Sequence, residues 1–271
     1  MSAFADLFDF RMFFLAALLF VPLERLFGAK REQKLLRPLW TLDLLYVFAN
    51  GILIRIGLIG SAALLIAASP LLVPADWRAA VAGQPIWLQL IEVMLLADLG
   101  LYLMHRTFHA VPALWRIHQI HHSIEDMDWL AAHRVHPIDQ ILTKSASFLP
   151  LFALGFSGTA IGIFGLIFQF HAVLVHANVR LGFGPLNRLF VSPDFHHWHH
   201  ARDREAWDRN FAAQFALWDY AFGTAYLPAG RKAENFGISE PLPDAYPDQL
   251  FYPFRRETRS SRAIHESSGA I

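Results

Sequence analysis

Long apolar stretches restrict most strongly how this chain can fold. Residues 42–69 form one such stretch, and its only charged residues are Asp43 and Arg55. As a helix it would be about 42 Å long, which exceeds the roughly 30 Å hydrocarbon core of a bilayer. The 55% hydrophobic content and the mean hydropathy of +0.33 are also high for a soluble protein. We therefore expect a membrane-embedded helix that tilts, or breaks near Gly51 or Gly57.

Four further apolar runs follow the same pattern. Residues 10–27 predict a retained membrane anchor, because acidic residues precede the run and no cleavage pattern follows it. Residues 86–104 are long enough to span. Residues 142–154 and 159–175 fall short of the approximately 20 residues that a spanning helix needs, so they predict a hairpin that enters the membrane without fully crossing it.

The distribution of basic residues predicts the orientation. A cluster of four follows the first run (Lys30, Arg31, Lys34 and Arg37), which indicates a cytoplasmic flank. The runs then return the later segments to this side. The predicted fold is an all-α, multi-pass membrane helical bundle with a cytoplasmic histidine-rich helical cap. We expect a transmembrane region over 1–97, a di-metal domain over 98–228 and a C-terminal tail over 229–271, of which 260–271 is loose.

Histidines carry the functional signal. Thirteen of the 14 lie between His105 and His200. Residues three or four apart share one face of a helix, and three motifs, HRTFH, HQIHH and HHWHH, have this spacing. A His-x-x-His-His pattern is expected about 0.04 times by chance at this histidine frequency, yet the chain has two. The resulting candidate ligands are His105, His109, His118, His121, His122, His196, His199 and His200.

A pair of metal ions is the simplest explanation for these clusters. So many imidazoles without a metal would leave competing donors and acceptors, and protonated members would repel one another. One ion takes four to six ligands, so eight histidines indicate two ions. The chain has no cysteine, so thiolate ligands are excluded. Imidazole suits zinc, copper, iron and nickel alike.

Five other residues are candidates for the neighbourhood of the metals. His136 and His176 are additional candidate ligands. His133 and His197 are expected to lie next to the ligands rather than to bind a metal. Asp98 lies inside an apolar run, so it either orients a histidine of another cluster or pairs with an arginine.

The order of these motifs resembles the fatty acid hydroxylase superfamily, also called the sterol desaturase family. The resemblance covers residues 98–228 and rests on HRTFH, LWRIHQIHH, HRVHP, HAN, HHWHH and WDYAFGT. It implies a membrane di-metal oxygenase, usually described as di-iron, with ligands from the three clusters and from His176. Some members carry two histidines four residues apart before HAN, whereas Ala172 stands at the first of these positions here.

The expected activity is hydroxylation or desaturation of a lipid C–H bond with O2. The expected cofactor is a pair of iron ions, with zinc as an occupant of a purified or resting form. The expected partners are the bilayer, a lipid substrate and an external electron donor of the ferredoxin or cytochrome type, because no dinucleotide fingerprint is evident. Zero net charge gives no reason to expect nucleic acid.

Two alternatives remain open. A membrane zinc hydrolase is one, although Arg106 stands where a His-Glu-x-x-His protease carries its general base. A metal transporter or sensor is the other, and it predicts ligands distributed along the membrane path. Metal analysis and the oxygen dependence of turnover would distinguish these readings.

Overall fold

The computed structural model describes residues 10–255, and this part of the chain folds into helices joined by loops. It contains no strand, only two isolated β-bridges. The predicted all-helical fold is therefore confirmed for these residues. The helices of at least eight residues are α2 (Phe10–Phe27), α3 (Trp40–Leu72), α4 (Ala75–Ala82), α5 (Ile86–Ala110), α6 (Pro112–His122), α7 (Pro137–Leu154) and α8 (Gly158–His176).

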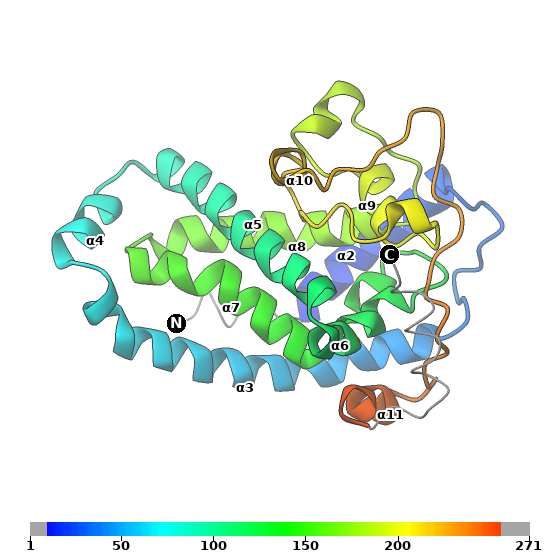
Figure 1. Ribbon diagram of the computed structural model, residues 1–271, viewed down its shortest axis with the longest axis horizontal. Helices are drawn as coiled ribbons and strands as arrows, with labels where there is room; N and C mark the ends of the chain where they lie inside the picture. The colour runs from blue at the N-terminus through cyan, green and yellow to red at the C-terminus, as the bar shows by residue number, and fades with distance from the viewer. Residues whose placement is uncertain (1–9, 256–271) are drawn as a thin grey trace.

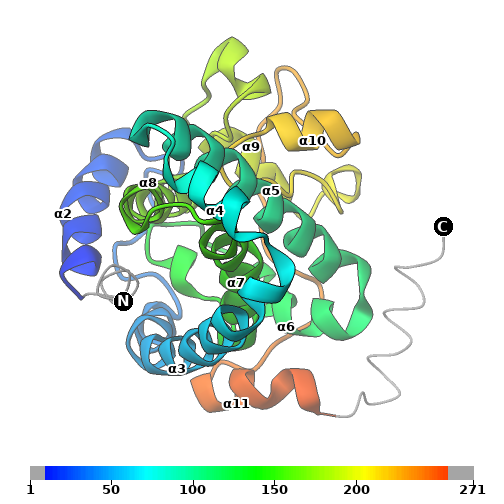
Figure 2. The same cartoon turned by 90° about the vertical axis from the view of Figure 1, so that its left-hand side faces the viewer.

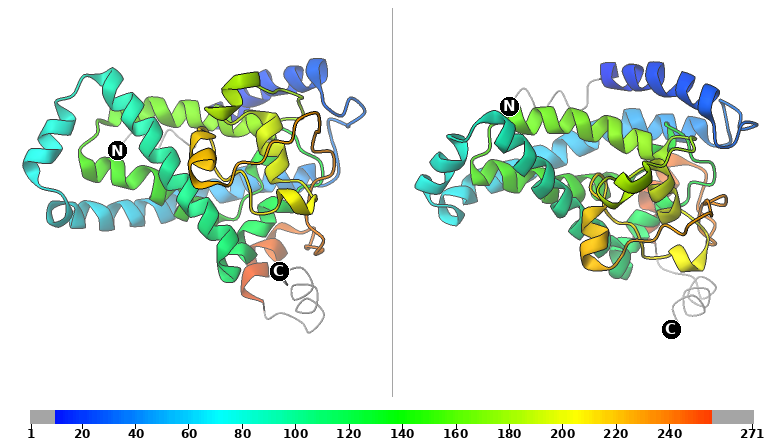
Figure 3. Two further views of the ribbon diagram at one scale, coloured as in Figure 1. Left: turned by 45° about the horizontal axis from the view of Figure 1, so that its top comes forward. Right: turned by 90° about the horizontal axis from the view of Figure 1, so that it is seen from above.

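Shorter helices follow in the C-terminal half. They are α9 (Pro193–His199), α10 (Leu217–Phe222) and α11 (Tyr246–Phe251), together with the 3₁₀ turns η2 (Ala131–His133), η3 (Gly184–Arg188), η4 (Arg204–Ala206) and η5 (Tyr252–Phe254). The long helices α3, α5, α7 and α8 run along the molecule, with α4 at one end and the short helices at the other (Figure 1). Two further views show the same division (Figure 3).

Three of the described helices are long and apolar enough to cross a membrane, over Trp40–Leu65, Ile86–Ala110 and Gly158–His176. The last of these corrects our expectation that this segment is too short to span, because the helix extends beyond the apolar residues at both ends. Helix α2 is not among the three; its 18 residues include Arg11, Glu24 and Arg25.

Helix α3 is continuous over 33 residues, so of the two expected alternatives, a tilt or a break near Gly51 or Gly57, the break does not occur. At 1.5 Å per residue it is about 50 Å long. Gly57 instead serves packing, since a Cβ at this position would lie 2.3 Å from Ile141 Cδ1 of α7. The absence of a side chain therefore lets α3 and α7 approach closely along their length.

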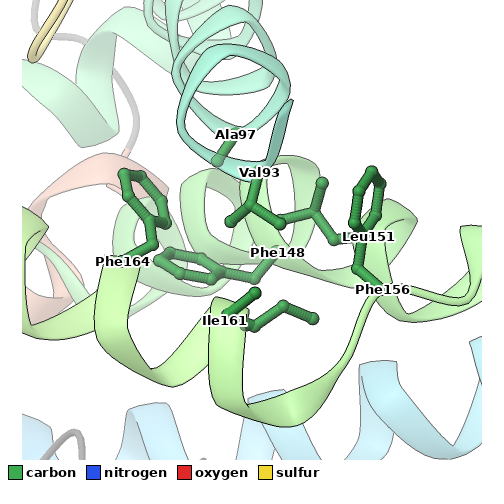
Figure 4. Packing of buried hydrophobic residues seen from close by; sticks show 8 residues of the cluster. Val93, Ala97, Phe148, Leu151, Phe156, Ile161 and Phe164 are labelled. Atoms are coloured by element: carbon green, nitrogen blue, oxygen red, sulfur yellow. The ribbon is translucent and has the colours of Figure 1, made fainter. Parts of the chain in front are cut away.

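The core of the bundle lies between α5, α7 and α8. Val93 and Ala97 of α5 pack on Phe148 and Leu151 of α7 and on Phe164 of α8 (Figure 4). Burial of large apolar side chains contributes about 1.5–3 kcal/mol each. This cluster therefore fixes α5 and α8, whose C-terminal ends carry grouped histidines, and α7, whose N-terminal end carries Asp139 beside His118.

The end of the bundle that carries α4 is closed by a turn between α7 and α8. Gly155 ends α7 with φ of +97°, a conformation that residues with a side chain rarely adopt. A Cβ there would lie 2.6 Å from the carbonyl oxygen of Arg78 in α4. Seen end-on, α4 crosses this end, and α2 lies beside α8 at the edge of the bundle (Figure 2).

A buried ionic network joins the loop before α3 to the segment that follows α6. Arg37 binds Asp128 and Asp43, and Arg134 binds Asp43, with distances of 2.5–2.8 Å for the closest atoms. All four side chains are at most 6% exposed. Two positive and two negative charges balance, which is the condition for tolerating buried charge.

Much of the segment after residue 229 packs on the bundle. Tyr46 of α3 donates to the side chain of Gln249 in α11, and Tyr246 donates to Asn50 of α3. Arg116 of α6 donates to the carbonyl oxygen of Tyr252. The expected loose tail, 260–271, lies outside the described residues.

Candidate metal centre

The C-terminal ends of four helices converge at the end of the molecule away from α4. Helix α5 contributes His105 and His109, α6 contributes three histidines, α8 ends at His176, and α9 with its C-cap contributes three more. The C-terminal end of a helix carries a partial negative charge. Four such ends pointing to one region favour a cation there.

Nine histidines form two adjacent groups in this region. Within each group the candidate ligand atoms lie within 4.8 Å of one another. The first group, which we call group one, consists of His105, His109, His118, His122 and His199, and group two consists of His121, His176, His196 and His200. The rings of His122 and His200 stack with centroids 4.6 Å apart. The two groups are therefore in direct contact.

The structure brings together the histidines of all three sequence motifs but divides two motifs between the groups. His118 and His122 belong to group one, whereas His121 between them belongs to group two. His199 belongs to group one, whereas its neighbour His200 belongs to group two. Helices α6 and α9 thus present histidines to both groups, which sequence spacing alone did not predict.

Outward hydrogen bonds fix the orientation of most rings. Six histidines direct Nδ1 to an oxygen outside the groups: His105 to Phe211 O, His109 to Asp208 Oδ1, His118 to Asp139 Oδ2, His121 to Arg134 O, His176 to Ala172 O and His199 to Arg209 O, at 2.6–3.2 Å. Carbonyl and carboxylate oxygens only accept, so Nδ1 carries the hydrogen. In the neutral ring Nε2 is then a bare acceptor that faces the group.

Two of these Nε2 atoms meet in each group. His105 Nε2 lies 3.0 Å from His118 Nε2, and His121 Nε2 lies 3.0 Å from His176 Nε2. Two bare lone pairs at this distance repel unless a cation lies between them. Ligands at right angles and about 2.1 Å from one metal ion are themselves about 3.0 Å apart. The donor set therefore fits one metal ion in each group.

Burial keeps the rings outside the candidate membrane helices neutral. It is the largest cause that lowers the pKa of His121, His122, His196 and His200 well below its usual value, and neighbouring histidines lower it further. Burial also lowers the pKa of His199 to about 3. Neutral imidazole is the form that binds a metal.

Buried ring nitrogens without a protein partner complete the fit. Among the described residues these include Nε2 of His109 and His199 and Nδ1 of His196 and His200. Buried polar atoms are rarely left unsatisfied. For His109 and His199 a metal at Nε2 would satisfy the atom, because Nδ1 is already bound.

Three of the remaining predicted residues are histidines that lie outside both groups. His136 lies outside both groups: its Nδ1 accepts from the N–H of Ile138 at the start of α7, and its Nε2 bonds to Leu250 O. His197 bonds to Ala177 O and faces away from its neighbours. His133 lies outside both groups, and its Nε2 has no hydrogen-bond partner within residues 10–255.

Among residues 10–255, no hydrogen bond or ion pair joins Asp98 to a histidine or to an arginine. Its carboxylate accepts the backbone N–H groups of Ala213, Gln214 and Phe215 at 2.8–3.2 Å. This corrects both sequence-based readings. The aspartate instead fixes the loop that begins with Phe211, the residue whose carbonyl holds His105.

Sequence reasoning missed Asp139 as a partner of the histidines. Its carboxylate lies 2.6 Å from His118 Nδ1, and both side chains are about 5–6% exposed. Thr143 one turn later donates to the other carboxylate oxygen. The available signal was an acidic residue in the first turn of a helix after HRVHP, but the partner lies 21 residues away.

A cavity of about 330 Å³ opens beside the two groups. Its wall includes His105 and His118 of group one and His121, His176 and His196 of group two. Apolar side chains of α2, α3 and α8, such as Phe13, Phe48 and Phe168, form much of the remainder. The cavity thus joins the histidines to the part of the molecule that contains the candidate membrane helices.

A helical protein with three candidate membrane spans and two histidine groups is the class that fold and site define. Residues 90–224 match the family model described as fatty acid hydroxylase. The chain is 30% identical over 175 residues to ornithine lipid hydroxylase OlsE of Rhizobium tropici, covering 65% of this chain and 53% of that protein. It is 34% identical over 148 residues to alkylglycerol monooxygenase of Homo sapiens, covering 54% and 32%.

The chain belongs to the fatty acid hydroxylase superfamily, as its motifs predicted. It spans about half the length of the Rhizobium relative and about a third of the human one. No solved structure matches it.

Proposed function

We propose that this protein is a membrane di-iron oxygenase that hydroxylates or desaturates a lipid C–H bond with O2. The observation that carries the proposal is the pair of Nε2–Nε2 contacts at 3.0 Å, one in each histidine group, between rings whose Nδ1 atoms are bound elsewhere. The proposed ligands are the nine histidines of groups one and two. His136 is left out because backbone groups occupy both of its ring nitrogens.

Two iron ions, when bound, supply the oxygen activation that imidazole and carboxylate side chains lack. The protein's own residues hold the ligands and shape the cavity. In hydroxylation, one oxygen atom of O2 enters the C–H bond and the other leaves as water, with two electrons and two protons from outside. In desaturation, both oxygen atoms leave as water. The chain offers no cofactor motif for the electrons, so we propose a separate donor of the ferredoxin or cytochrome type.

The names of the two relatives support this assignment. One is a lipid hydroxylase and the other a monooxygenase, and both names denote oxygen insertion rather than hydrolysis. Iron is therefore favoured over zinc. The side-by-side position of the two groups at one end of the bundle also speaks against a transporter, which would distribute ligands along its helices.

We further propose a cytoplasmic position for the centre. The basic cluster of residues 30–37 precedes α3, and Asn178, two residues after the ligand His176, accepts the backbone N–H of Lys30. An excess of basic residues at one membrane face is typical of the cytoplasmic side. Protease protection or reporter fusions at residue 34 would test this orientation.

The decisive experiment is isotope labelling in cells that express the protein. Lipids extracted after growth under ¹⁸O₂ should contain a product with one ¹⁸O atom, or an additional double bond, that is absent with His121→Ala. His171→Ala is the matched control, because this histidine lies outside both groups. Purified protein should contain two iron ions per chain. Product oxygen derived from water, or turnover without O2, would reject the proposal in favour of a hydrolase.

A further inference from the structure

One loop holds three of the five histidines of group one. It lies between η4 and α10, and its residues 208–215 are called the 208–215 loop below. In group two, the carbonyls that hold the rings belong to Arg134 and Ala172, outside this loop. The position of the loop therefore bears chiefly on group one. Its three contacts are Asp208 Oδ1 with His109 Nδ1, Arg209 O with His199 Nδ1 and Phe211 O with His105 Nδ1, at 2.7–3.1 Å.

Two buried aspartates hold the loop in turn. Asp219 of α10 accepts the backbone N–H groups of Phe211 and Ala212 at 2.8 and 2.9 Å. Asp98 of α5 accepts the next three, those of residues 213–215, at 2.8–3.2 Å. Both aspartates are at most 1% exposed. Hydrogen bonds to a charged group are stronger than those between neutral groups, so five consecutive backbone donors are fixed by two carboxylates.

The WDYAFGT motif explains how Asp219 keeps its own position. Gly223 ends α10 with φ of +73°, the left-handed conformation that favours glycine. The chain thereby turns back, and the Thr224 hydroxyl donates to Asp219 Oδ1 at 2.7 Å. A hydroxyl has one hydrogen, so Tyr102 of α5 is the donor in its 3.0 Å contact with Thr224 Oγ1. The motif thus connects the aspartate to α5.

The mechanism described so far gives these two carboxylates no role. Neither belongs to a histidine group, and neither lines the cavity. Burial of a charge is costly unless hydrogen bonds compensate for it, and here the compensating donors all come from the loop and from the motif. Partners that orient a metal-binding histidine typically change metal affinity by about 10–100-fold. A carbonyl can orient a ring in this way only if its own position is fixed.

We propose that Asp219 and Asp98 are positioning residues for the metal ion of group one. By fixing the backbone N–H groups of the 208–215 loop, they fix the oxygens that orient three of the histidines in this group. The inference rests on the proposed function for the presence of a metal ion. Group two meets the loop through a hydrogen bond from Asn210 to Phe195 O, which ends on the backbone of α9 and not on a ring.

Iron binding without turnover tests the inference one group at a time. His196→Ala removes a proposed ligand of group two and leaves group one to be measured, and His118→Ala does the reverse. In each background of the full chain, chelator competition under argon measures the affinity for iron(II). Asp219→Asn should weaken group one by about ten-fold, because the amide has one acceptor oxygen where the carboxylate has two. Group two should change by less than about three-fold.

A milder pair of substitutions keeps the test decisive where Asp219→Asn does not fold. Thr224→Val keeps the shape of the side chain but removes the hydroxyl that donates to Asp219, whereas Thr224→Ser keeps the hydroxyl. Valine should weaken iron binding at group one by about two- to five-fold, and serine should restore it. Thermal unfolding of the metal-free protein verifies that each variant is folded.

Cobalt(II) gives a spectroscopic readout at group one in the His196→Ala background. Its visible absorption depends on the geometry of the ligands, so Asp219→Asn should change the spectrum even when the site is saturated with metal. Val93→Ala, in the core cluster of α5, α7 and α8, is the control for lost stability. It should lower the unfolding midpoint and leave the cobalt spectrum unchanged.

An unchanged affinity of group one in folded Asp219→Asn, or in Thr224→Val where the aspartate variant does not fold, would overturn this inference alone. Equal weakening of both groups would also overturn it, since the aspartate would then stabilise the fold without positioning a particular site. Absence of iron from both backgrounds before Asp219 is changed would reject the proposed metal centre together with this inference.

Discussion

The two histidine groups contain similar proposed ligands but differ in what holds the rings. In group one, His109 and His118 direct Nδ1 to carboxylates, and His105 and His199 direct it to backbone carbonyls. In group two, His121 and His176 use carbonyls, while Nδ1 of His196 and of His200 has no hydrogen-bond partner in the part of the chain that the structure describes. A carboxylate partner raises the basicity of the imidazole and fixes its orientation. Group one is therefore expected to bind its ion more tightly.

Removal of a proposed ligand should weaken iron binding more than any other change. It should also show whether the two groups bind their ions independently. His118→Ala should leave the ion of group two in place, and His196→Ala should leave that of group one. We expect each affected site to bind iron at least ~100-fold more weakly, beyond the 10–100-fold typical of an outer partner. Metal analysis after dialysis gives the stoichiometry, with His171→Ala as control. Loss of both ions from either single variant would mean that the groups do not bind independently.

Acid should destabilise the metal-free protein through both groups. Folding lowers the histidine pKa values, so below about pH 6.5 the unfolded chain takes up protons that the folded chain does not. The contribution of these neutral rings to the free energy of unfolding is thus fully present above about pH 6.5 and is lost as the pH decreases. For His199 the loss continues down to its folded-state pKa of about 3. Each fully buried ring contributes up to about 1.4 kcal/mol per pH unit. Unfolding midpoints of chelator-treated protein at pH 7.5, 6.5 and 5.5 should decrease in that order.

The same series with bound iron sharpens the comparison between the groups. Protons compete with the metal for the ring nitrogens, so group two should release its ion at a higher pH than group one. Iron retained after equilibration at each pH measures this order.

For the metal-free protein, an unfolding midpoint that does not change between pH 7.5 and 5.5 would contradict the buried, neutral state of these rings.

Asp139→Asn tests the carboxylate that distinguishes group one. The amide keeps the size of the side chain but loses the charge that supports His118. Affinity for the ion of group one should fall by about 10–100-fold, and group two should change little. Chelator competition monitored by metal analysis measures both sites, with Asp126→Asn as a matched control on a partly exposed aspartate. A greater loss from group two would contradict the assignment.

Helical spacing predicted eight of the nine grouped histidines as candidate ligands, because residues three or four apart must share a helix face. It did not predict how α6 and α9 divide them, since the division depends on how two helices far apart in sequence face each other. His136 and His176 looked alike as additional candidates. The two residues differ in their local position, because His136 precedes Pro137 and caps α7 with its own ring. The sequence already indicated a helix start here, since proline is common at the first position of a helix.

The long helices were also predictable, because apolar runs of this length have few alternatives to a membrane helix. The ends of these helices were harder to predict. The apolar run of residues 159–175 gave no sign that Gly158 and His176 extend the helix, nor that α3 continues through Gly51 and Gly57. Packing against α7 explains why a glycine stands at position 57 within the continuous helix α3, since Ile141 occupies the space that a side chain on Gly57 would need.

Asp208→Asn should have the smallest effect, and it completes the comparison. Asp208 also faces a proposed ligand of group one, His109, but its Oδ1 lies 3.1 Å from His109 Nδ1, and its side chain is 73% exposed. Exposed charge pairs contribute about 0–1 kcal/mol, so affinity should fall by less than about five-fold. Asn tolerates the left-handed backbone conformation at this position, where φ is 54°.

Salt distinguishes the two carboxylates. The small loss of affinity in Asp208→Asn should disappear in 1 M salt, where the screening length is about 3 Å. The loss of affinity in Asp139→Asn should persist, because salt screens buried charges far less. Equal, salt-resistant losses in the two variants would mean that burial of the carboxylate does not control how firmly it supports the metal ligand.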